Sequence, residues 1–580
     1  MSTNISGEKR EALISKIVQI REFIEQNGKD KNAARLISYL GDLFKEINGK
    51  KYGLVFEEHR EKIDEILEQS APVFTEEKKL FIDGGGELNF LLEGDNLASL
   101  NLLEKTHRGK IDVIYIDPPY NTGNKDFVYD DDFVDTEDTF RHSKWCSFLK
   151  TRLKLSRELL SDKGMILISI DDNELTNLKL ICDEIFGEQN NLGIFIVKST
   201  PNARDYGHVG KMHEYILFYA KKYSYVETNM MPIEDKVFKY SDENGGFNIH
   251  PLYNSNEAFT NENRPNLFYP FYLNPKSKKE DFYEISLEKQ KSWIEIYPPK
   301  SLKNGIQFVW RWGKEKALEN LNKEIIGYKV ADNEYRIVQK MRHDEKLIRS
   351  ILESTEYTSR KGTSDLESIL GNKVFSFPKP IQLLRDILFM ASHSTSTILD
   401  FFAGSGTTGH AVLKLNAEDG GHRKFILCTN NENNICRDIT YERIKTVITG
   451  KRKDGSKYSD GLPGSLKYFK TDFIPISEKM YYEYADDLLL HVRELVELEN
   501  AVNFDKDNSV AIVLDDDEME EFIEKVVSTG SSTTGTCPTT TKTLYMGHDV
   551  LLSSKQERIL KAHNITVNVI PDYYYRDLAL

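Results

Sequence analysis

Several features that mark other protein classes are missing from this chain of 580 residues. It has no run of about 18 consecutive apolar residues, so no segment is predicted to span a membrane. Its first ten residues contain no apolar stretch of the signal-peptide type. A Walker A motif, which would bind nucleotide phosphates, is also absent. These absences predict a cytoplasmic protein without membrane contact.

Cysteine is scarce, and the five residues of this type are scattered along the chain: Cys146, Cys182, Cys428, Cys436 and Cys537. No two of them form a Cys-x-x-Cys pair, so the pattern is typical of neither a disulfide framework nor a zinc site. We therefore expect reduced thiols and no metal.

Positive charge is also in short supply, because 77 Lys+Arg face 92 Asp+Glu and the net charge is −15. Residues 476–530 hold 16 acidic and 4 basic residues, a net charge of −12, so the rest of the chain carries only −3. A nearly neutral body can still hold a local basic groove for nucleic acid. We expect the acidic stretch to face solvent or a protein partner, and a plain solvated surface explains it equally well.

Strand-like and helix-like segments alternate over much of the chain, which predicts an α/β fold with a doubly wound, mainly parallel, Rossmann-like sheet. The strands are expected at 88–92, 112–116, 165–170, 194–197, 215–220, 397–402 and 424–429, with two further strands at 511–514 and 565–570 near the C-terminus. The helices are expected at 143–160, 174–186 and from 409 onward.

Changes in composition divide the chain into five expected regions. These are an N-terminal helical region at 1–76, the first half of the α/β domain at 77–222, a mixed α+β insertion at 223–375, the second half at 376–474, and an acidic C-terminal α/β domain at 475–580. In the first region, apolar residues at helical spacing predict a helix that packs on the main domain or on a second subunit.

A glycine-rich loop, Asp400-Phe-Phe-Ala-Gly-Ser-Gly-Thr-Thr-Gly409, follows an expected strand and opens an expected helix. It contains the GxGxxG pattern of dinucleotide sites, although a simple glycine-rich turn also fits. A carboxylate at Asp400 would repel a pyrophosphate, but it suits the cationic amino-acid part of S-adenosylmethionine. Glu432, after the next strand, can accept both ribose hydroxyls or be a solvated loop acid.

The segment Asp117-Pro-Pro-Tyr120 follows the strand at 112–116, at the carboxyl edge where open α/β sheets bind ligands. The two prolines fix the backbone and lack N–H donors, so their carbonyls remain as acceptors. With Asp117 they can accept both hydrogens of an amino group and direct its lone pair toward an electrophilic methyl group. Tyr120 offers a flat face to an unstacked base. A proline turn would explain Pro118 and Pro119, but neither Asp117 nor Tyr120.

Asp117–Tyr120 matches the catalytic motif of amino-methyltransferases, and Phe402–Gly406 resembles their cofactor loop. The catalytic motif comes first and the insertion lies between the two, which is the order of the β class of DNA adenine methyltransferases. More closely, residues 80–475 resemble the modification (Mod) subunit of Type III restriction–modification systems. Arg264–Pro270, Phe377–Pro380 and Cys428–Asn434 extend this resemblance.

The resemblance implies methyl transfer from S-adenosylmethionine to N6 of an adenine flipped out of duplex DNA, without a metal. Its catalytic residues would be Asp117, Pro118, Pro119 and Tyr120. Its cofactor contacts would be Asp95, Lys379, Asp400, Phe402, Ala403, Gly404, Ser405, Gly406, Thr407, Thr408 and Glu432. Lys379 also fits a salt bridge near the carboxylates. Aromatic residues in His213-Glu214-Tyr215 would flank the target base or pack in the core.

The insertion would be the target-recognition domain. Its candidate DNA contacts are Lys276, Lys278, Lys279, Lys289, Lys291 and Arg311, although a solvated lysine-rich face explains any one of them. The implied partners are double-stranded DNA, a second copy in a homodimer and a restriction (Res) subunit, because no nuclease motif is evident here. The alternatives are an orphan adenine methyltransferase, an amino-methyltransferase acting on RNA or protein, an NAD-dependent oxidoreductase and a non-catalytic DNA-recognition subunit.

Overall fold

The computed structural model describes residues 5–27, 36–41, 43–44, 56–123, 128–129, 132–134, 137–202, 208–233, 236–332, 334–476, 491–529, 541–547 and 549–570. The chain divides into two compact units, one formed by 1–229 with 349–580 and the other by 230–348. The second unit is shorter than the expected insertion at 223–375. Residues 223–229 and 349–375 belong to the first unit, where they pack against its sheet and helices.

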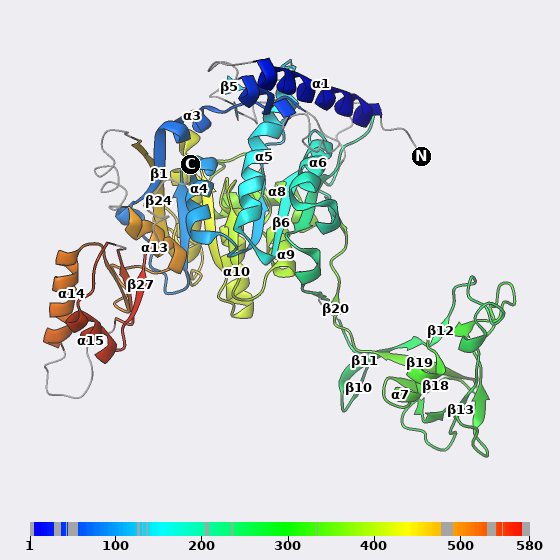
Figure 1. Ribbon diagram of the computed structural model, residues 1–580. Helices are drawn as coiled ribbons and strands as arrows, with labels where there is room; N and C mark the ends of the chain where they lie inside the picture. Colours follow the sequence, from blue (N-terminus) through cyan, green and yellow to red (C-terminus); the bar gives the residue numbers. More distant parts are fainter. Residues whose placement is uncertain are drawn as a thin grey trace. The chain divides into compact units, whose positions relative to one another are not determined.

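A ten-stranded sheet forms the centre of the first unit (Figure 1). In spatial order its strands are β1 (Ser70–Glu76), β24 (Ser465–Pro475), β2 (Leu88–Glu93), β23 (Lys424–Thr429), β22 (Thr397–Asp400), β3 (Ile111–Ile116), β6 (Leu160–Ile170), β8 (Glu214–Ala220), β7 (Asn191–Val197) and β21 (Ile351–Leu352). Six of the nine neighbouring pairs are parallel, so the predicted mainly parallel sheet is confirmed.

Two groups of helices pack against this sheet. One group consists of α13 (Val492–Asn500), α4 (Asn96–His107), α5 (Arg141–Leu159) and α6 (Leu175–Phe186). The other consists of α8 (Ser359–Leu370), α11 (Glu442–Thr449), α10 (Thr407–Asp419) and α9 (Ile381–Ala391). Because parallel crossovers are right-handed, connections that run in opposite directions along the sheet lie on opposite faces. The fold is therefore doubly wound, as predicted.

The direction of winding reverses between β22 and β3. From β3 the chain passes through α5 to β6, whereas from β22 it passes through α10 to β23 on the other side. In open α/β sheets the carboxyl ends of two such strands bound the ligand-binding crevice. Here these ends carry Asp117 and Asp400, the two acids that the sequence singled out.

Smaller elements complete the first unit. They are α1 (Ile5–Asn27), α3 (Lys62–Gln69), the hairpin β4 (Val128–Tyr129) and β5 (Asp132–Phe133), the short helices η1 (Lys78–Leu80), η2 (Glu188–Asn190), η3 (Tyr223–Tyr225), η5 (Thr355–Tyr357) and η6 (Glu432–Asn434), and the π-helix η7 (Ile435–Tyr441). The N-terminal region that was expected to be helical is helical in α1, at 36–41 and 43–44, and in α3, but not at 56–61. Much of the remainder lies outside the described residues.

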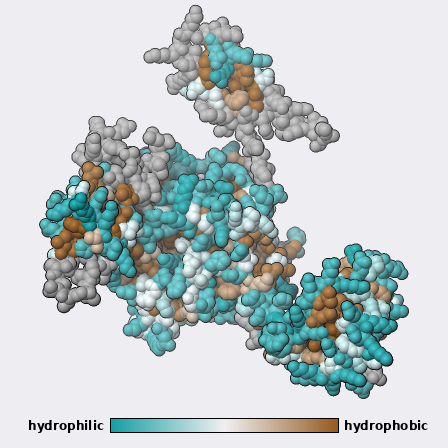
Figure 2. All heavy atoms as spheres, turned by 60° about the horizontal axis from the view of Figure 1, so that its bottom comes forward, coloured by the Kyte–Doolittle hydropathy of each residue, from teal (hydrophilic) through white to brown (hydrophobic). Residues whose placement is uncertain are grey.

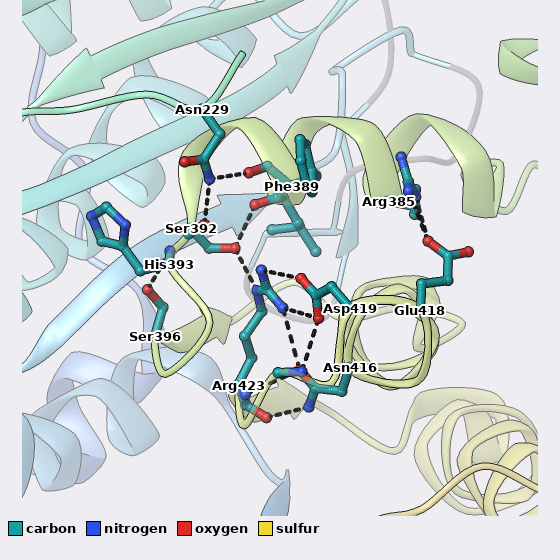
Figure 3. Close-up of polar contacts among 12 residues, drawn as sticks. Asn229, Arg385, Phe389, Ser392, His393, Ser396, Asn416, Glu418, Asp419 and Arg423 are labelled. Atoms are coloured by element: carbon teal, nitrogen blue, oxygen red, sulfur yellow. Dashed lines mark hydrogen bonds and ion pairs between the residues drawn. The ribbon is translucent and has the colours of Figure 1, made fainter. Parts of the chain in front are cut away.

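The chain leaves the first unit at a clamped residue, Asn229 (Figure 3). The Asn229 side-chain amide donates to the carbonyls of Phe389 and Ser392, at 2.7 and 2.8 Å, at the carboxyl end of α9. The buried Arg423 supports this end, because its Nε donates to the Ser392 hydroxyl at 2.9 Å and its guanidinium pairs with Asp419. The segment that enters the second unit is thus fixed to α9.

The regular secondary structure of the second unit is mostly β-strand, joined by long loops. A five-stranded antiparallel sheet contains β10 (Tyr240–Asp242), β11 (Gly245–Pro251), β19 (Glu334–Met341), β18 (Ile325–Ala331) and β14 (Phe282–Tyr283). Smaller sheets contain β15 (Ile285–Ser286), β13 (Phe271–Leu273) and β16 (Ile294–Ile296), the pair β12 (Tyr253–Asn254) and β17 (Val309–Trp310), and the pair β9 (Met231–Pro232) and β20 (Glu345–Lys346). The helices are η4 (Pro265–Leu267) and α7 (Lys314–Glu319). The face of this unit that Figure 2 shows is mostly hydrophilic, with an apolar patch in it.

The C-terminal region combines a helix of the main body with a small α/β unit. The latter has three parallel strands, β25 (Val510–Val513), β26 (Thr543–Met546) and β27 (Thr566–Val569), with α14 (Asp516–Thr529) and α15 (Ser554–Ala562). It has an apolar core of its own. Strands at 511–514 and 565–570 were predicted, whereas β26 was not.

The expectation that residues 476–530 face solvent or a partner is wrong for α13. Its apolar side chains are buried in the main core, and Glu497 is fully buried beside the fully buried Lys467 of β24, with 2.5 Å between Oε2 and Nζ. The net charge of the stretch 476–530 did not reveal this helix, because most of the 16 acids lie outside α13, which places four apolar side chains in the core. Residues 477–490 lie outside the described residues.

The four described cysteines are free and buried, and Cys537 lies outside the described residues. Among the residues that the structure places, no helix is both long and apolar enough to cross a membrane.

Candidate functional site

A cavity of about 940 Å³ opens at the point where the sheet reverses its winding. Three segments form much of its lining: the turn Asp117–Tyr120 after β3, the loop Phe402–Ser405 after β22, and Phe375–Lys379 before α9. Thr407, Thr408 and Asp400 add to it. The predicted catalytic turn and most of the predicted cofactor loop therefore face one cavity.

The catalytic turn is held from behind by α5. The Trp145 indole Nε1 donates to the Pro119 carbonyl at 2.7 Å, and Trp145 is fully buried. Asn121, with a φ of 57° in the left-handed region, is also buried and donates from Nδ2 to Glu174 Oε1 at 2.5 Å. No hydrogen bond from the described part of the chain reaches the Pro118 carbonyl. Of the two proline carbonyls, that of Pro118 is the one left for a ligand.

A cluster of charged and phenolic groups surrounds Asp117. The Lys379 ammonium lies 3.2 Å from Asp117 Oδ1 and 3.0 Å from Glu214 Oε2, and it donates to the Tyr120 hydroxyl at 2.5 Å. Burial raises the pKa of Asp117, the Lys379 charge lowers it, and Glu214 raises it, so the pKa stays above its ordinary value. Burial also raises the pKa of the Tyr120 phenol well above its usual range, so Tyr120 stays protonated. The predicted salt bridge of Lys379 is present.

Asp400 is a buried carboxylate whose two partners are both neutral. Its Oδ1 accepts from the Phe402 amide at 3.0 Å, and its Oδ2 accepts from the Thr408 hydroxyl at 2.5 Å. No described lysine, arginine or histidine lies within ion-pair distance. Burial therefore raises the pKa of Asp400 to about 7. Such a group favours a cationic ligand, which would stabilise its charged form.

The cofactor loop is shaped by glycines and by a buried arginine. Gly404 has a φ of 49° and borders the cavity, so a side chain there would be strained and would narrow the space for a ligand. Arg443 is fully buried under the loop, and its Nη1 donates to the Ser405 carbonyl at 3.2 Å and to the Thr407 hydroxyl at 2.7 Å. Arg443 thus fixes the loop from the side opposite the cavity.

Three predicted cofactor residues do not line this cavity. Asp95 caps α4, where its carboxylate accepts from the Leu97 amide at 2.7 Å. Gly406 caps α10 with a φ of 74°, and a β-carbon there would meet Thr440 at 3.1 Å. Glu432 is exposed at the start of η6. Their roles toward a cofactor stay predictions.

The six predicted DNA contacts all belong to the second unit and are exposed there. Lys276, Lys278 and Lys279 lie between β13 and β14, Lys289 and Lys291 lie between β15 and β16, and Arg311 follows β17.

The donor set of the cavity fits S-adenosylmethionine. Asp400 is buried and has no cationic partner among the described residues, so a bound cation would stabilise its charged form. Gly404 has no side chain and leaves space for a ligand in the cavity. Among the described residues no group of three or more metal-binding side chains is assembled.

Sequence reasoning missed several residues that shape the site. Glu214 was noted in a triplet without a role, and Trp145, Glu174 and Arg443 were not noted as part of the site at all. Each lies far along the chain from the motif that it supports, so only the folded arrangement reveals it. A buried acid at the start of a strand is the one pattern that could have pointed to Glu214.

Comparison with known proteins agrees with this geometry. Residues 111–442, more than half of the chain, match the N6/N4 family model described as DNA methylase. The chain is 35% identical over 387 residues to the Type II methyltransferase M.KpnI of Klebsiella pneumoniae, covering 66% of this chain and 90% of that protein. It is 32% identical over 376 residues to the EcoPI Mod subunit of Escherichia phage P1, with coverages of 59% and 58%.

The StyLTI Mod subunit of Salmonella typhimurium is 33% identical over 388 residues, with coverages of 62% and 55%. The chain thus spans most of the Type II relative but little more than half the length of these two Mod subunits. On the family match and the Type II relative together, the chain belongs to the N6/N4 DNA methylase family.

Proposed function

We propose that the protein transfers a methyl group from S-adenosylmethionine to the N6 amino group of an adenine in duplex DNA, at a specific sequence. The observation that carries this proposal is the meeting of two motifs at one cavity. Asp117 and the Pro118 carbonyl provide acceptors for an amino group, and Asp400 beside Gly404 provides a site for a cationic cofactor.

When bound, S-adenosylmethionine supplies an electrophilic methyl group on sulfur. Asp117 and the Pro118 carbonyl accept the two hydrogens of the amino group, which frees the nitrogen lone pair for the new bond to carbon. With S-adenosylmethionine bound, the carbon–sulfur bond would break with its electron pair left on sulfur, and the proton lost from nitrogen would pass to the Asp117 carboxylate that already accepts that hydrogen. The rate gain comes from positioning and from negative charge next to the nitrogen as it becomes positive.

The target base must leave the duplex to enter this cavity, and unstacking costs a few kcal/mol. Tyr120 lines the cavity and offers an aromatic face that offsets part of this cost. The exposed lysines and Arg311 of the second unit are proposed to contact DNA, where backbone contacts set the position and base contacts set the sequence.

As the modification subunit of a Type III system, the protein would form a homodimer and bind a restriction subunit. The Mod relatives support this assignment. One observation favours a second candidate, a methyltransferase that works without a restriction partner: the chain matches 90% of the Type II relative but only 55–58% of these two Mod subunits. Light scattering on the purified protein, with and without DNA, tests the dimer.

The test of the reaction is to incubate the protein with radiolabelled S-adenosylmethionine and duplex DNA, then to identify the labelled nucleoside. Label in N6-methyladenine supports the proposal. Label only in N4-methylcytosine would assign the other amino group, and label only with RNA would assign another substrate. Single-molecule sequencing of the modified DNA then gives the recognition sequence.

A further inference from the structure

Glu214, the first residue of β8, is a buried acid beside the catalytic turn, and only 8% of it is exposed. β8 runs antiparallel to β6, and Tyr215 pairs with Ile170, the last residue of β6. The start of β8 therefore reaches the same sheet edge as the carboxyl ends of the parallel strands. This arrangement brings the Glu214 carboxylate into the crevice that also holds Asp117 and Asp400.

The Lys379 ammonium is shared between two carboxylates, but not equally. It donates a hydrogen bond to Glu214 Oε2 at 3.0 Å and another to the Tyr120 hydroxyl, which in turn donates to Glu214 at 3.2 Å. Asp117 Oδ1 lies 3.2 Å from the ammonium but accepts no hydrogen bond of good geometry from the described residues. The Asp117 side chain remains 28% exposed and lines the cavity.

This geometry matters for methyl transfer because Asp117 has to accept a hydrogen from the target amino group. An ammonium that hydrogen-bonded fully to Asp117 would compete with that amino group. We propose that Glu214 is a positioning residue for the reaction, which holds the Lys379 ammonium so that Asp117 stays available to the target base. The inference rests on the methyl transfer proposed above and assigns a residue to it that the motif does not contain.

The charges around Asp117 make the inference measurable. Tyr115, Tyr120, Lys379, Glu214 and Asp400 interact electrostatically with Asp117, and the titratable residues Asp171, Asp172, Lys211 and His213 line the same cavity. The Lys379 charge lowers the Asp117 pKa and the Glu214 charge raises it. Lys379 itself has a raised pKa, because the two carboxylates outweigh the effect of its burial, so it stays an ammonium. Both tyrosine pKa values are raised well above their usual range, so the phenols do not titrate with Asp117.

Methyl transfer needs Asp117 in its charged form, so activity falls on the acid side as Asp117 becomes protonated. The experiment measures kcat against pH for the full-length protein and for Glu214→Gln and Lys379→Met. Loss of the Glu214 charge lowers the Asp117 pKa, so the acid limb should move down by about one pH unit. Loss of the ammonium should move it up. At the plateau, kcat of Glu214→Gln should fall about tenfold, while the dissociation constant for S-adenosylmethionine stays unchanged.

Glu497→Gln is the matched control, because it also neutralises a buried acid paired with a buried lysine, outside the cavity. It should lower the melting temperature without moving the acid limb. If Glu214→Gln does not fold, Glu214→Asp keeps the charge and should leave the limb in place with a reduced plateau. An acid limb that is unchanged in both Glu214→Gln and Lys379→Met, or that moves the same way in both, overturns the inference. Absence of methyl transfer by the unchanged protein would instead contradict the proposed function.

Discussion

At the scale of single residues, Asp117 is where the proposed chemistry can be tested most directly. Asp117→Ala removes an acceptor of the amino hydrogens and leaves the Lys379 ammonium with Glu214. Because this acceptor acts on the reacting nitrogen, kcat should fall at least about 100-fold. Calorimetry with S-adenosylmethionine and a DNA-binding assay should give values near those of the unchanged protein. Near-normal turnover in this variant would rule out the mechanism.

Asp400 predicts a pH dependence for cofactor binding rather than for chemistry. Its pKa of about 7 lies above the ordinary value because of burial, so below that pH the protonated form predominates. A cationic ligand binds the charged form. The affinity for S-adenosylmethionine should therefore be constant well above the pKa and fall by about tenfold per pH unit well below it. Calorimetry over this range checks the slope, and Asp400→Asn should give weak binding without the slope.

The site residues that could be predicted from the sequence are those that belong to a short contiguous motif. Asp117 follows an apolar strand and is followed by two prolines, and Asp400 ends another apolar strand and is followed by a glycine-rich loop. Packing alone does not require either combination. Glu214, Trp145 and Arg443 act on those segments from elsewhere in the chain, and a lone buried acid, tryptophan or arginine occurs in many folds for reasons of packing alone. Only the topology of the sheet brings them to the motif.

At the scale of elements, α5 supports the catalytic turn through the hydrogen bond from Trp145 to Pro119. Trp145→Phe keeps most of the buried ring but removes the indole N–H that Pro119 accepts at 2.7 Å. The turn should then be held less firmly, and kcat should fall several-fold with little change in cofactor affinity. The loss in stability should be about 1 kcal/mol.

Trp310→Phe is a matched control, because the Trp310 indole donates to the Tyr269 carbonyl, also at 2.7 Å, inside the second unit. It should cost a similar free energy of unfolding and leave kcat at saturating DNA unchanged. Equal losses of kcat in the two variants would show that Trp145 acts through stability alone.

The central strands could be predicted closely, whereas the strands at the edges could not. β23 occupies the residues expected for it, 424–429, because a short continuous apolar run between two helices is typical of a buried parallel strand. β1, β21 and β24 went unpredicted. β1 contains Pro72 and lies at the edge of the sheet, where proline is tolerated, and β21 has only two residues. Pairing partners far along the chain decide such strands.

At the scale of the whole molecule, the acidic C-terminal region is not a detachable part. A chain that ends after residue 475 loses α13 and deprives Lys467, which is fully buried in the intact chain, of its Glu497 partner, with Glu76 at 3.3 Å as its remaining carboxylate. Removing one partner of a buried ion pair costs about 3–5 kcal/mol. This truncation should lower the melting temperature sharply and abolish cofactor binding.

A chain that ends after residue 508 keeps α13 and its partners, and it should still bind S-adenosylmethionine. Thermal unfolding and calorimetry on the two truncated proteins check the difference. If both behave alike, α13 does not stabilise the sheet in the way that its burial indicates.

Composition predicts an insertion at 223–375, whereas the second compact unit has the narrower bounds 230–348. The change to a segment rich in aromatic residues and lysine begins near 223, but the chain remains attached to the first unit until Asn229 bonds to the end of α9. Similarly, α8 and the segment before α9 have mixed composition, yet they line the cavity through Ser359 and Phe375–Lys379. Contacts between segments that are distant in the sequence set the boundaries of the two units, and such contacts cannot be inferred from composition.

The paired strands β9 and β20 bear on how the DNA sequence that such an enzyme recognises could change. The chain enters the second unit through β9 and leaves it through β20, and these two strands are hydrogen-bonded to each other. Entry and exit thus form a single joint, while the strands that carry Asp117 and Asp400 belong wholly to the other unit. On the proposal that the second unit reads DNA, exchange of the segment from 230 to 348 as one piece would redirect the same methylating body to another DNA sequence, without any change in the residues that perform the reaction.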